Sequence, residues 1–490
     1  MDPELSIIYN TDIDMTEKCV EIYLKTLPLG IIDFIIMKLH MELLLLGAGI
    51  TSAQWSHPMG GAALFRDVEA YAAEGLHRTG TDVDLSTSEW VATGLANAGF
   101  DVEFVNFTVK PFYDYTSCSL SLDGVDFTCY PVWLPAAATS LASVAIGNKL
   151  GEVHIVEVDS PSLGGDAGDA ITAAIEAGAA GVLVSNRNIY CADSPVALNA
   201  PAPYTTTEWK VPVVLIGCGA LAAFGAAPPT VLTKLAVAGS STESATSRNV
   251  VGTLRIDGNG GNGGFANHSA GPTPLSPHLD PRLKNASTCG VKRVIVSTPI
   301  SGWFHCGGER GPGVAIFRAL SRALPRVAAS RLNECESLEM LFVATSGHEL
   351  GDMGAELNLR TLEERGWGVE SGVDAFVSLG ASIITWQNIT GAGSTPDGIY
   401  RSPLCYNTET LGDALVGPFA EAGFDAGLNR SDLAGELLKV IGAGYSAFGF
   451  YGDFYRFHTP EDDAESTSPE LLELAAKATF KSIKRLLFLD

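Results

Sequence analysis

Two short stretches of the 490-residue chain carry side chains that can transfer protons, attack a carbonyl carbon or bind a metal ion. They contain Ser301, His305, Cys306, Glu309 and Arg310, followed later by His348 and Glu349. An imidazole titrates near neutral pH and suits general acid–base chemistry, and a thiol beside a cation is activated as a nucleophile. These residues are the candidates for catalysis if the chain is an enzyme.

Each stretch follows an apolar run with the length of a buried strand, residues 294–297 and 340–344. Between these runs, residues 313–324 carry apolar side chains at near-helical spacing: Val314, Ile316, Phe317 and Leu320. The pattern predicts a strand–helix–strand unit of an α/β sheet. Ligands of such sheets bind at the carboxyl ends of the strands, where the candidate residues lie.

Length and composition exclude several classes of protein. A chain of 490 residues predicts two or three domains. Hydrophobic content of 46% with 18% charged residues is typical of a folded protein and not of a disordered one. The net charge of −25 repels phosphate backbones, so we expect no nucleic-acid partner.

The N-terminal region predicts a secreted protein. Residues 37–42 form a modest n-region, residues 43–50 an apolar core and residues 51–53 a small-residue cleavage site, as in a signal peptide. Lys38 and Glu42 interrupt any longer apolar run, so we expect no membrane span. Five N-glycosylation sequons, which fit a secreted glycoprotein, begin at Asn106, Asn267, Asn285, Asn388 and Asn429.

Removal of residues 1–53 would leave eight cysteines, an even number that fits disulfide pairing. Cys118 and Cys129 flank a segment with Asp123-Gly124 at its centre, a pair that favours a hairpin turn, and we expect a disulfide across it. Cys191 with Cys218 is a plausible second pair. The sequence leaves the partners of four cysteines open: Cys289, Cys306, Cys335 and Cys405.

Capping residues predict two helix starts. Ser86-Thr87-Ser88-Glu89 has the form of a capping box, which predicts a helix beginning there. Ser468, followed by Pro469 at the first helical position, predicts the start of an amphipathic C-terminal helix.

The order of these motifs resembles the zinc aminopeptidase-like fold, which secreted aminopeptidases, glutaminyl cyclases and the transferrin receptor share. The resemblance rests on the strand at 294–298, on Gly313-Val314-Ala315, and on the motifs FVATSGHELGDMGA and FHTPEDD. It implies an α/β fold with a mostly parallel central sheet flanked by helices. The Ala- and Val-rich middle of the chain resembles a protease-associated domain, a small β-rich insert.

The resemblance also implies an order of domains. The implied parts are an N-terminal extension with the signal peptide (1–53), the first part of the exopeptidase-like domain (54–130), the protease-associated insert (131–245) and the second part of the exopeptidase-like domain (246–490).

Active members of this family bind two zinc ions, and the chain departs from their ligand pattern. The resemblance places Pro299-Ile300-Ser301 at the His-x-Asp position, and Glu309 at the metal-bridging Asp. It places His348-Glu349 at the Glu-Glu pair that supplies the general base and a ligand, and Gly380 at a later Asp. Of the ligands, Glu349 and His458 are unchanged. A standard two-zinc aminopeptidase is therefore excluded.

Two readings of the metal site remain open. The resemblance implies that Glu309, Glu349 and His458 hold one zinc ion, and three protein ligands with an open position describe a catalytic zinc. Alternatively, Arg310 neutralises Glu309 in an ion network without metal.

The other candidate residues also carry open alternatives. His348, in the general-base position, could activate a zinc-bound water. Alternatively, it could act as the base for Cys306, the only plausible nucleophile among these residues. For Cys306, we expect instead a disulfide with Cys289 or Cys335. Trp303, Phe304 and His305 are the candidate substrate-binding residues, with simple packing as the alternative for the two aromatic residues.

Three functions follow from these readings. The first is a hydrolase or cyclase with a rewired site and one zinc ion or none, acting on an amide, an ester or a small-molecule carbonyl. The second is a metal-free cyclase or transferase that uses Cys306 and His348. The third is a non-catalytic binding protein on a peptidase fold. A peptide or small molecule is the expected partner in each case.

Overall fold

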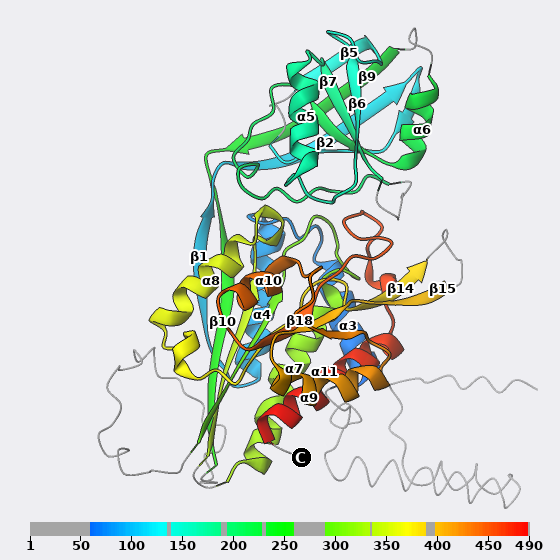
Figure 1. The fold of residues 1–490 in the computed structure, drawn as a ribbon. Coiled ribbons are helices and arrows are strands. Elements are labelled where there is room, and N and C mark those ends of the chain that lie inside the picture. Colours follow the sequence, from blue (N-terminus) through cyan, green and yellow to red (C-terminus); the bar gives the residue numbers. More distant parts are fainter. Residues whose placement is uncertain are drawn as a thin grey trace, which may run out of the picture. The chain divides into compact units, whose positions relative to one another are not determined.

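The computed structural model describes residues 59–134, 139–187, 194–227, 232–258, 290–333, 336–388 and 397–488. In this part of the chain, eight strands form the main sheet (Figure 1). From one edge to the other they are β1 (Asp101–Val109), β10 (Ala245–Asp257), β12 (Ser337–Thr345), β11 (Val291–Pro299), β13 (Ala375–Ser378), β18 (Ala447–Phe450), β16 (Leu404–Tyr406) and β17 (Ala426–Leu428).

The central strands of this sheet, β12, β11, β13 and β18, pair in parallel. β1 and β10 continue the sheet with antiparallel pairing on one side, and β16 pairs antiparallel with β18 on the other. The predicted unit is confirmed as β11, α7 (Gly311–Arg331) and β12. Both strands are buried at their carboxyl halves because helices cover both faces, which explains their continuous apolar runs.

Helices cover both faces of the main sheet (Figure 1). One layer contains α7 with α3 (Gly61–Ala73), α4 (Asp82–Asn97), α9 (Glu409–Glu421) and α11 (Pro469–Phe488). The opposite layer contains α8 (Met353–Glu364) and α10 (Gly435–Gly442). Strand side chains alternate between the layers: Val294 and Val296 pack with the first, and Ile295 packs with the second. The predicted α/β fold class is confirmed.

One of the two predicted helix starts is confirmed and the other is wrong. α11 begins after Ser468, whose Oγ accepts a hydrogen bond from the Leu471 N–H at 3.4 Å. α4 begins before the predicted capping box at Ser86. Thr81 caps it, with Oγ1 accepting from the Asp84 N–H at 3.3 Å. An earlier cap with carboxylates in the first turn favours the longer helix, so Ser86 lies inside it.

Residues 112–242 contain two smaller four-stranded sheets (Figure 1). The first is formed by β3 (Val125–Phe127), β2 (Phe112–Leu122), β9 (Leu232–Thr242) and β5 (Thr139–Ala145). The second is formed by β4 (Cys129–Pro131), β8 (Val213–Ile216), β7 (Gly181–Asn186) and β6 (Val153–Val158). This segment also contains the helices α5 (Asp166–Glu176) and α6 (Cys218–Ala226).

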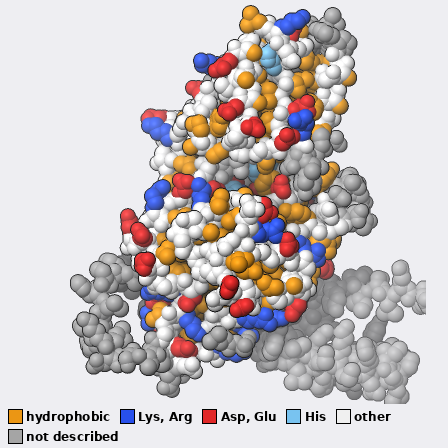
Figure 2. Space-filling model, viewed as in Figure 1, with side chains coloured by type: hydrophobic (Ala, Val, Ile, Leu, Met, Phe, Trp, Pro, Cys, Tyr) orange, Lys and Arg blue, Asp and Glu red, His pale blue; other side chains and the backbone are white. Residues whose placement is uncertain are grey.

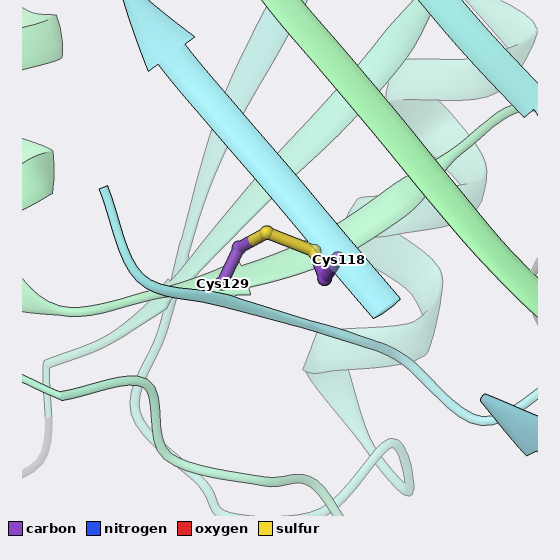
Figure 3. Close-up of a disulfide and its surroundings, with 2 residues drawn as sticks. All are labelled: Cys118 and Cys129. Atoms are coloured by element: carbon purple, nitrogen blue, oxygen red, sulfur yellow. A yellow bond between two sulfur atoms is a disulfide. The ribbon is translucent and has the colours of Figure 1, made fainter. Parts of the chain in front are cut away.

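A disulfide joins Cys118 on β2 to Cys129 at the start of β4, as predicted (Figure 3). It therefore connects the two smaller sheets. Asp123 and Gly124 form the turn between β2 and β3, and both have the positive φ that a tight hairpin requires. Cys218 is also disulfide-bonded, and its expected partner Cys191 lies outside the described residues.

The remaining described elements are short. They are the hairpin of β14 (Ile384–Asn388) and β15 (Asp397–Arg401), and the 3₁₀ helices η3 (His348–Leu350), η4 (Val369–Ser371) and η5 (Ala464–Ser466). None of the described helices has the length and apolar character needed to cross a bilayer. The predicted signal peptide lies outside the described residues. On the face in Figure 2, acidic and basic side chains are interspersed.

Candidate functional site

The candidate residues meet at the carboxyl ends of three strands of the main sheet, β12, β11 and β18. Ser301 follows β11, and Glu309 and Arg310 directly precede α7. Glu349 lies in η3 after β12, and His458 lies in the loop after β18. Because β12, β11, β13 and β18 are parallel and adjacent, the segments that follow them converge at one edge of the sheet. We call these five residues the ion cluster.

Arg310 is the centre of the ion cluster. Its Nη2 lies 2.8 Å from Glu309 Oε1 and 3.0 Å from Glu349 Oε1. Its Nε donates a hydrogen bond of 2.9 Å to the carbonyl oxygen of Ser301. The side chains of Arg310 and Glu309 are fully buried, and that of Glu349 is 2% exposed. A single guanidinium therefore pairs with two carboxylates away from solvent.

The charges in this cluster are fixed by one another. Burial raises the pKa of Glu309, but the positive charge of Arg310 and the contact with His458 outweigh it and lower the pKa to about 2. Burial lowers the pKa of Arg310, but the carboxylates of Glu309 and Glu349 outweigh it and raise the pKa. Glu309 is therefore ionised and Arg310 is charged throughout the neutral range.

Ser301 connects the cluster to the backbone after β12. Its hydroxyl donates to Glu349 Oε2 at 2.7 Å and accepts from the backbone N–H groups of Gly347 and His348 at 3.0 and 3.2 Å. Ser301 thus orients the carboxylate of Glu349 toward Arg310. The sequence singled out Ser301 as a candidate catalytic residue, and in the structure its hydroxyl is committed to these three contacts.

His458 closes the cluster from the opposite side. Its Nε2 lies 3.2 Å from Glu309 Oε1. Its Nδ1 donates a 2.9 Å hydrogen bond to the carbonyl oxygen of Ala197, since a carbonyl oxygen can only accept. His458 Nε2, both carboxylate oxygens of Glu309 and Nη1 of Arg310 lack a well-aligned hydrogen bond among the described residues. Within the cluster, the carboxylate of Glu309 is held by charge and not by directional hydrogen bonding.

Glu309, Glu349 and His458, the predicted zinc ligands, do not fit a metal ion in this arrangement. Arg310 Nη2 takes up the space between the two carboxylates, where a bridging ion would have to lie. Its permanent charge also repels a divalent cation. The ligand position at Gly380 is closed as well, because a Cβ there would lie 2.3 Å from the carbonyl oxygen of Phe450.

Two other groups of three side chains in the described chain place their potential metal-ligating atoms within 4.8 Å of one another. The first group is Cys306, Glu309 and Asp462. Asp462 accepts hydrogen bonds from the backbone N–H groups of Gly308 and Glu309 at 2.6 and 3.0 Å. Burial and the charge of Glu309 raise its pKa to about 8. Burial and the same charge raise the pKa of Cys306. Two of the three groups are thus biased toward their protonated forms, which do not bind metal.

The second group is His348, Asp352 and Glu436. His348 Nδ1 lies 2.8 Å from Asp352 Oδ1 and 3.4 Å from Glu436 Oε1. Burial and the charge of Arg310 lower the pKa of His348, but the two carboxylates outweigh them and raise it to about 10. A protonated imidazole neither binds metal nor accepts a proton at neutral pH. This geometry does not favour the predicted general-base role of His348.

Cys306 is a free, buried cysteine, so the expected disulfide with Cys289 or Cys335 is wrong. Cys306 lies in the loop that leads to α7, and its side chain is part of the core, with 1% of the residue exposed. A buried thiol with a raised pKa is a poor nucleophile, because the thiolate is the reactive form.

The predicted substrate-binding residues separate in the structure. Trp303 and Phe304 line a pocket together with aromatic residues of β2 and β4. His305 does not line this pocket, and its ring Nδ1 lies 2.9 Å from the carbonyl oxygen of Ala72. Ala197, which bonds His458, also lines the pocket. The pocket is therefore next to the ion cluster.

Sequence reasoning missed three carboxylates of this region. Asp462 belongs to the FHTPEDD motif, but only the histidine of that motif was selected. Asp352 lies four residues after His348, a spacing that brings side chains together on a helical turn. Glu436 is distant in sequence, and no local signal marks it. Its carboxylate accepts from the Thr345 hydroxyl at 3.0 Å.

No protein-family model and no curated protein matches this sequence. Solved structures do match. A zinc aminopeptidase from Bacillus subtilis is 16% identical with a TM-score of 0.61, and the match covers 89% of this chain and 97% of that one. The chain has the zinc aminopeptidase fold.

Two further structures with this fold are similar to the chain. A peptidase M28 precursor from Shewanella amazonensis is 16% identical with a TM-score of 0.60, covering 86% of this chain and 92% of that one. An aminopeptidase from Aneurinibacillus is 15% identical with a TM-score of 0.54, covering 87% and 94%. The aminopeptidase fold thus extends over most of the chain, and identities this low establish the fold alone.

Proposed function

We propose that this chain is a non-catalytic peptide-binding protein built on the zinc aminopeptidase fold. The observation that carries the proposal is the position of Arg310 Nη2, 2.8 Å from Glu309 and 3.0 Å from Glu349. In this arrangement the guanidinium lies between the two carboxylates, in the place of a metal ion. It supplies no open coordination position for water or substrate, which a catalytic zinc requires.

Two further features support a binding role. The pKa of His348 is raised to about 10, so this side chain does not take up a proton from a reacting group near pH 7. Cys306 is a buried thiol with a raised pKa and is therefore a poor nucleophile.

The similarity to aminopeptidases supports a peptide as the ligand. The Cys118–Cys129 disulfide supports a location outside the cytosol, where structural disulfides persist.

Zinc content and peptidase activity test the proposal together. We expect the protein, purified without chelator, to contain far less than one zinc ion per chain by elemental mass spectrometry, and to hydrolyse or cyclise no peptide amide. Arg310→Ala removes the guanidinium and leaves Glu349 and Glu309 without a cation. We expect this variant to bind added zinc.

The double variant Arg310→Ala/Glu349→Gln is the matched control, because it lacks one of the freed ligands while all groups on the surface are unchanged. We expect it to bind no more zinc than the unmodified protein. Stoichiometric zinc in the unmodified protein that disappears in Glu349→Gln would overturn the proposal. Hydrolysis or cyclisation that disappears in the same variant would replace it with the hydrolase or cyclase reading.

A further inference from the structure

Residues 194–201, in the segment that contains the two smaller sheets, lie against the loops that carry the ion cluster, and we call them the strap. The Ala197 N–H donates to the carbonyl oxygen of His458 at 2.8 Å, and His458 Nδ1 donates back to the carbonyl oxygen of Ala197 at 2.9 Å. The Ala200 N–H donates to the carbonyl oxygen of Glu349 at 2.7 Å. The strap makes all three contacts with its main chain.

The conformation of the strap follows from its sequence. Pro195 and Pro201 restrict the residues before them to extended backbone, and none of the strap residues is helical. Asn199 forms a parallel bridge with Ser162, and its main chain bonds to the residues on either side of Ser162 at 2.8 and 2.7 Å. The two edges of the strap therefore have different partners, its own segment on one edge and the ion-cluster loops on the other.

Side chains of the strap reach the same loops. Asn199 Oδ1 accepts a 2.9 Å hydrogen bond from Trp303 Nε1 in the loop after β11. The Ser194 hydroxyl donates to the carboxylate of Glu461 in the loop after β18. Leu198 is buried in an apolar cluster with residues of the loops after β11 and β12. The strap thus contacts each of the three loops that carry the ion cluster.

The strap lies where ligands of α/β sheets bind, at the carboxyl ends of the parallel strands. Peptides that bind as extended strands likewise gain affinity from main-chain hydrogen bonds and specificity from alternate side chains. We propose that the strap is an internal ligand of the peptide-binding site, and that a peptide binds by displacing it from these loops. This inference rests on the proposed peptide-binding function and specifies where the peptide lies.

The contacts of the strap also define the class of peptide. Ala197 and Ala200 are at most 5% exposed and supply N–H donors, so small residues with a free N–H fit these positions. Leu198 supplies an apolar side chain, and Asn199 supplies an acceptor for the indole N–H of Trp303. The expected ligand is an extended peptide of the type Ala-Leu-Asn-Ala.

Fluorescence anisotropy with the full chain tests the inference, with a labelled octapeptide of the strap sequence, SPVALNAP, as the probe. Ser194→Ala/Asn199→Ala removes two hydrogen bonds of the internal strap and leaves the loops that receive the probe unchanged. Because the site is closed for less of the time in this variant, we expect it to bind the probe about tenfold more tightly than the unmodified protein.

Tyr204→Phe is the matched control. It removes the 3.2 Å hydrogen bond from the Tyr204 hydroxyl to Asp169, which lies in the same segment and does not involve the strap, so probe binding should be unchanged. A second probe with proline in place of both alanines lacks the two N–H donors and should bind at least about tenfold more weakly.

Equal binding of the probe by the unmodified protein and the folded double variant would overturn the inference, because the peptide would then lie elsewhere. Binding by neither would also overturn it, because the strap would then be a fixed part of the fold. If the double variant does not fold, hydrogen exchange of the unmodified protein decides. Saturating probe should speed exchange in residues 194–201, and unchanged exchange would overturn the inference.

Mass spectrometry of the probe in the same samples separates this inference from the proposed function. Cleavage of the probe would refute the non-catalytic function and leave displacement of the strap intact. Equal binding without cleavage would leave the peptide-binding function standing and refute the strap as its internal ligand.

Discussion

Nη2 of Arg310 lies 3.0 Å from Oε1 of Glu349, and both side chains are buried. The two residues follow adjacent parallel strands, at the edge of the sheet where ligands of α/β proteins bind. The same nitrogen contacts Glu309, so one guanidinium holds together the two carboxylates that the aminopeptidase resemblance assigns to a metal ion. The cation between these two carboxylates is the side chain of Arg310.

The ion cluster should make a large contribution to stability. Arg310→Met leaves Glu309 and Glu349 buried without a cation, and we expect the free energy of unfolding near pH 7 to fall by about 3–5 kcal/mol. Urea denaturation followed by circular dichroism measures this change. Arg322→Met in α7, the helix that Arg310 precedes, is the control. Arg322 pairs with Asp67 at 3.0 Å while one third exposed, so its loss should be below about 1 kcal/mol. Equal losses would contradict the buried pairing.

The ion pair of His348 should make stability depend on pH. Its pKa is raised from 6.5 to about 10, so the stabilisation is fully present below pH 6.5 and is lost as pH rises through 10. We expect His348→Gln to be less stable at pH 6 by at least about 1.4 kcal/mol, the equivalent of one pKa unit. The difference from the unmodified protein should shrink toward pH 10.

Urea denaturation of both proteins at pH 6, 8 and 10 measures that difference. Burial lowers the pKa of Lys439, but Glu356 and Asp352 outweigh it and raise the pKa, so Lys439 stays mostly charged over this range in both proteins. A difference that stays constant with pH would mean that His348 is not held protonated by Asp352 and Glu436.

Close packing at the start of α7 should exclude any side chain at Gly313. A Cβ there would lie 2.7 Å from the carbonyl oxygen of Leu379 and 2.9 Å from Thr298 Oγ1. We expect Gly313→Ala to destabilise the protein by about 1–3 kcal/mol despite the higher helix propensity of alanine. Thermal unfolding measures this loss.

Gly442→Ala is the matched control in α10, because a Cβ at Gly442 would meet no atom within 4 Å. There we expect a gain of up to about 1 kcal/mol, since only helix propensity changes. A gain at both glycines would contradict the close approach of α7 to β13.

The binary pattern of the chain determined much of its fold. The apolar runs of β11 and β12 predicted two buried parallel strands, because a strand covered on both faces must be apolar throughout. Asp123-Gly124 predicted the hairpin turn and the Cys118–Cys129 pair. The predicted start of α4 is wrong, because Thr81 and Ser86 both suit a cap and the earlier cap, with two carboxylates in the first turn, begins the helix.

Sequence order also determined which segments could form the site, since residues that follow neighbouring parallel strands must meet at one edge. Only the tertiary structure decided what they do there. Whether Arg310 pairs with Glu309 alone or also with Glu349, 39 residues away, depends on interatomic distances of about 3 Å. Those distances arise from the packing of α7, η3 and the loop after β18 together. No local pattern encodes them, and the guanidinium between the two carboxylates is therefore a property of the folded chain.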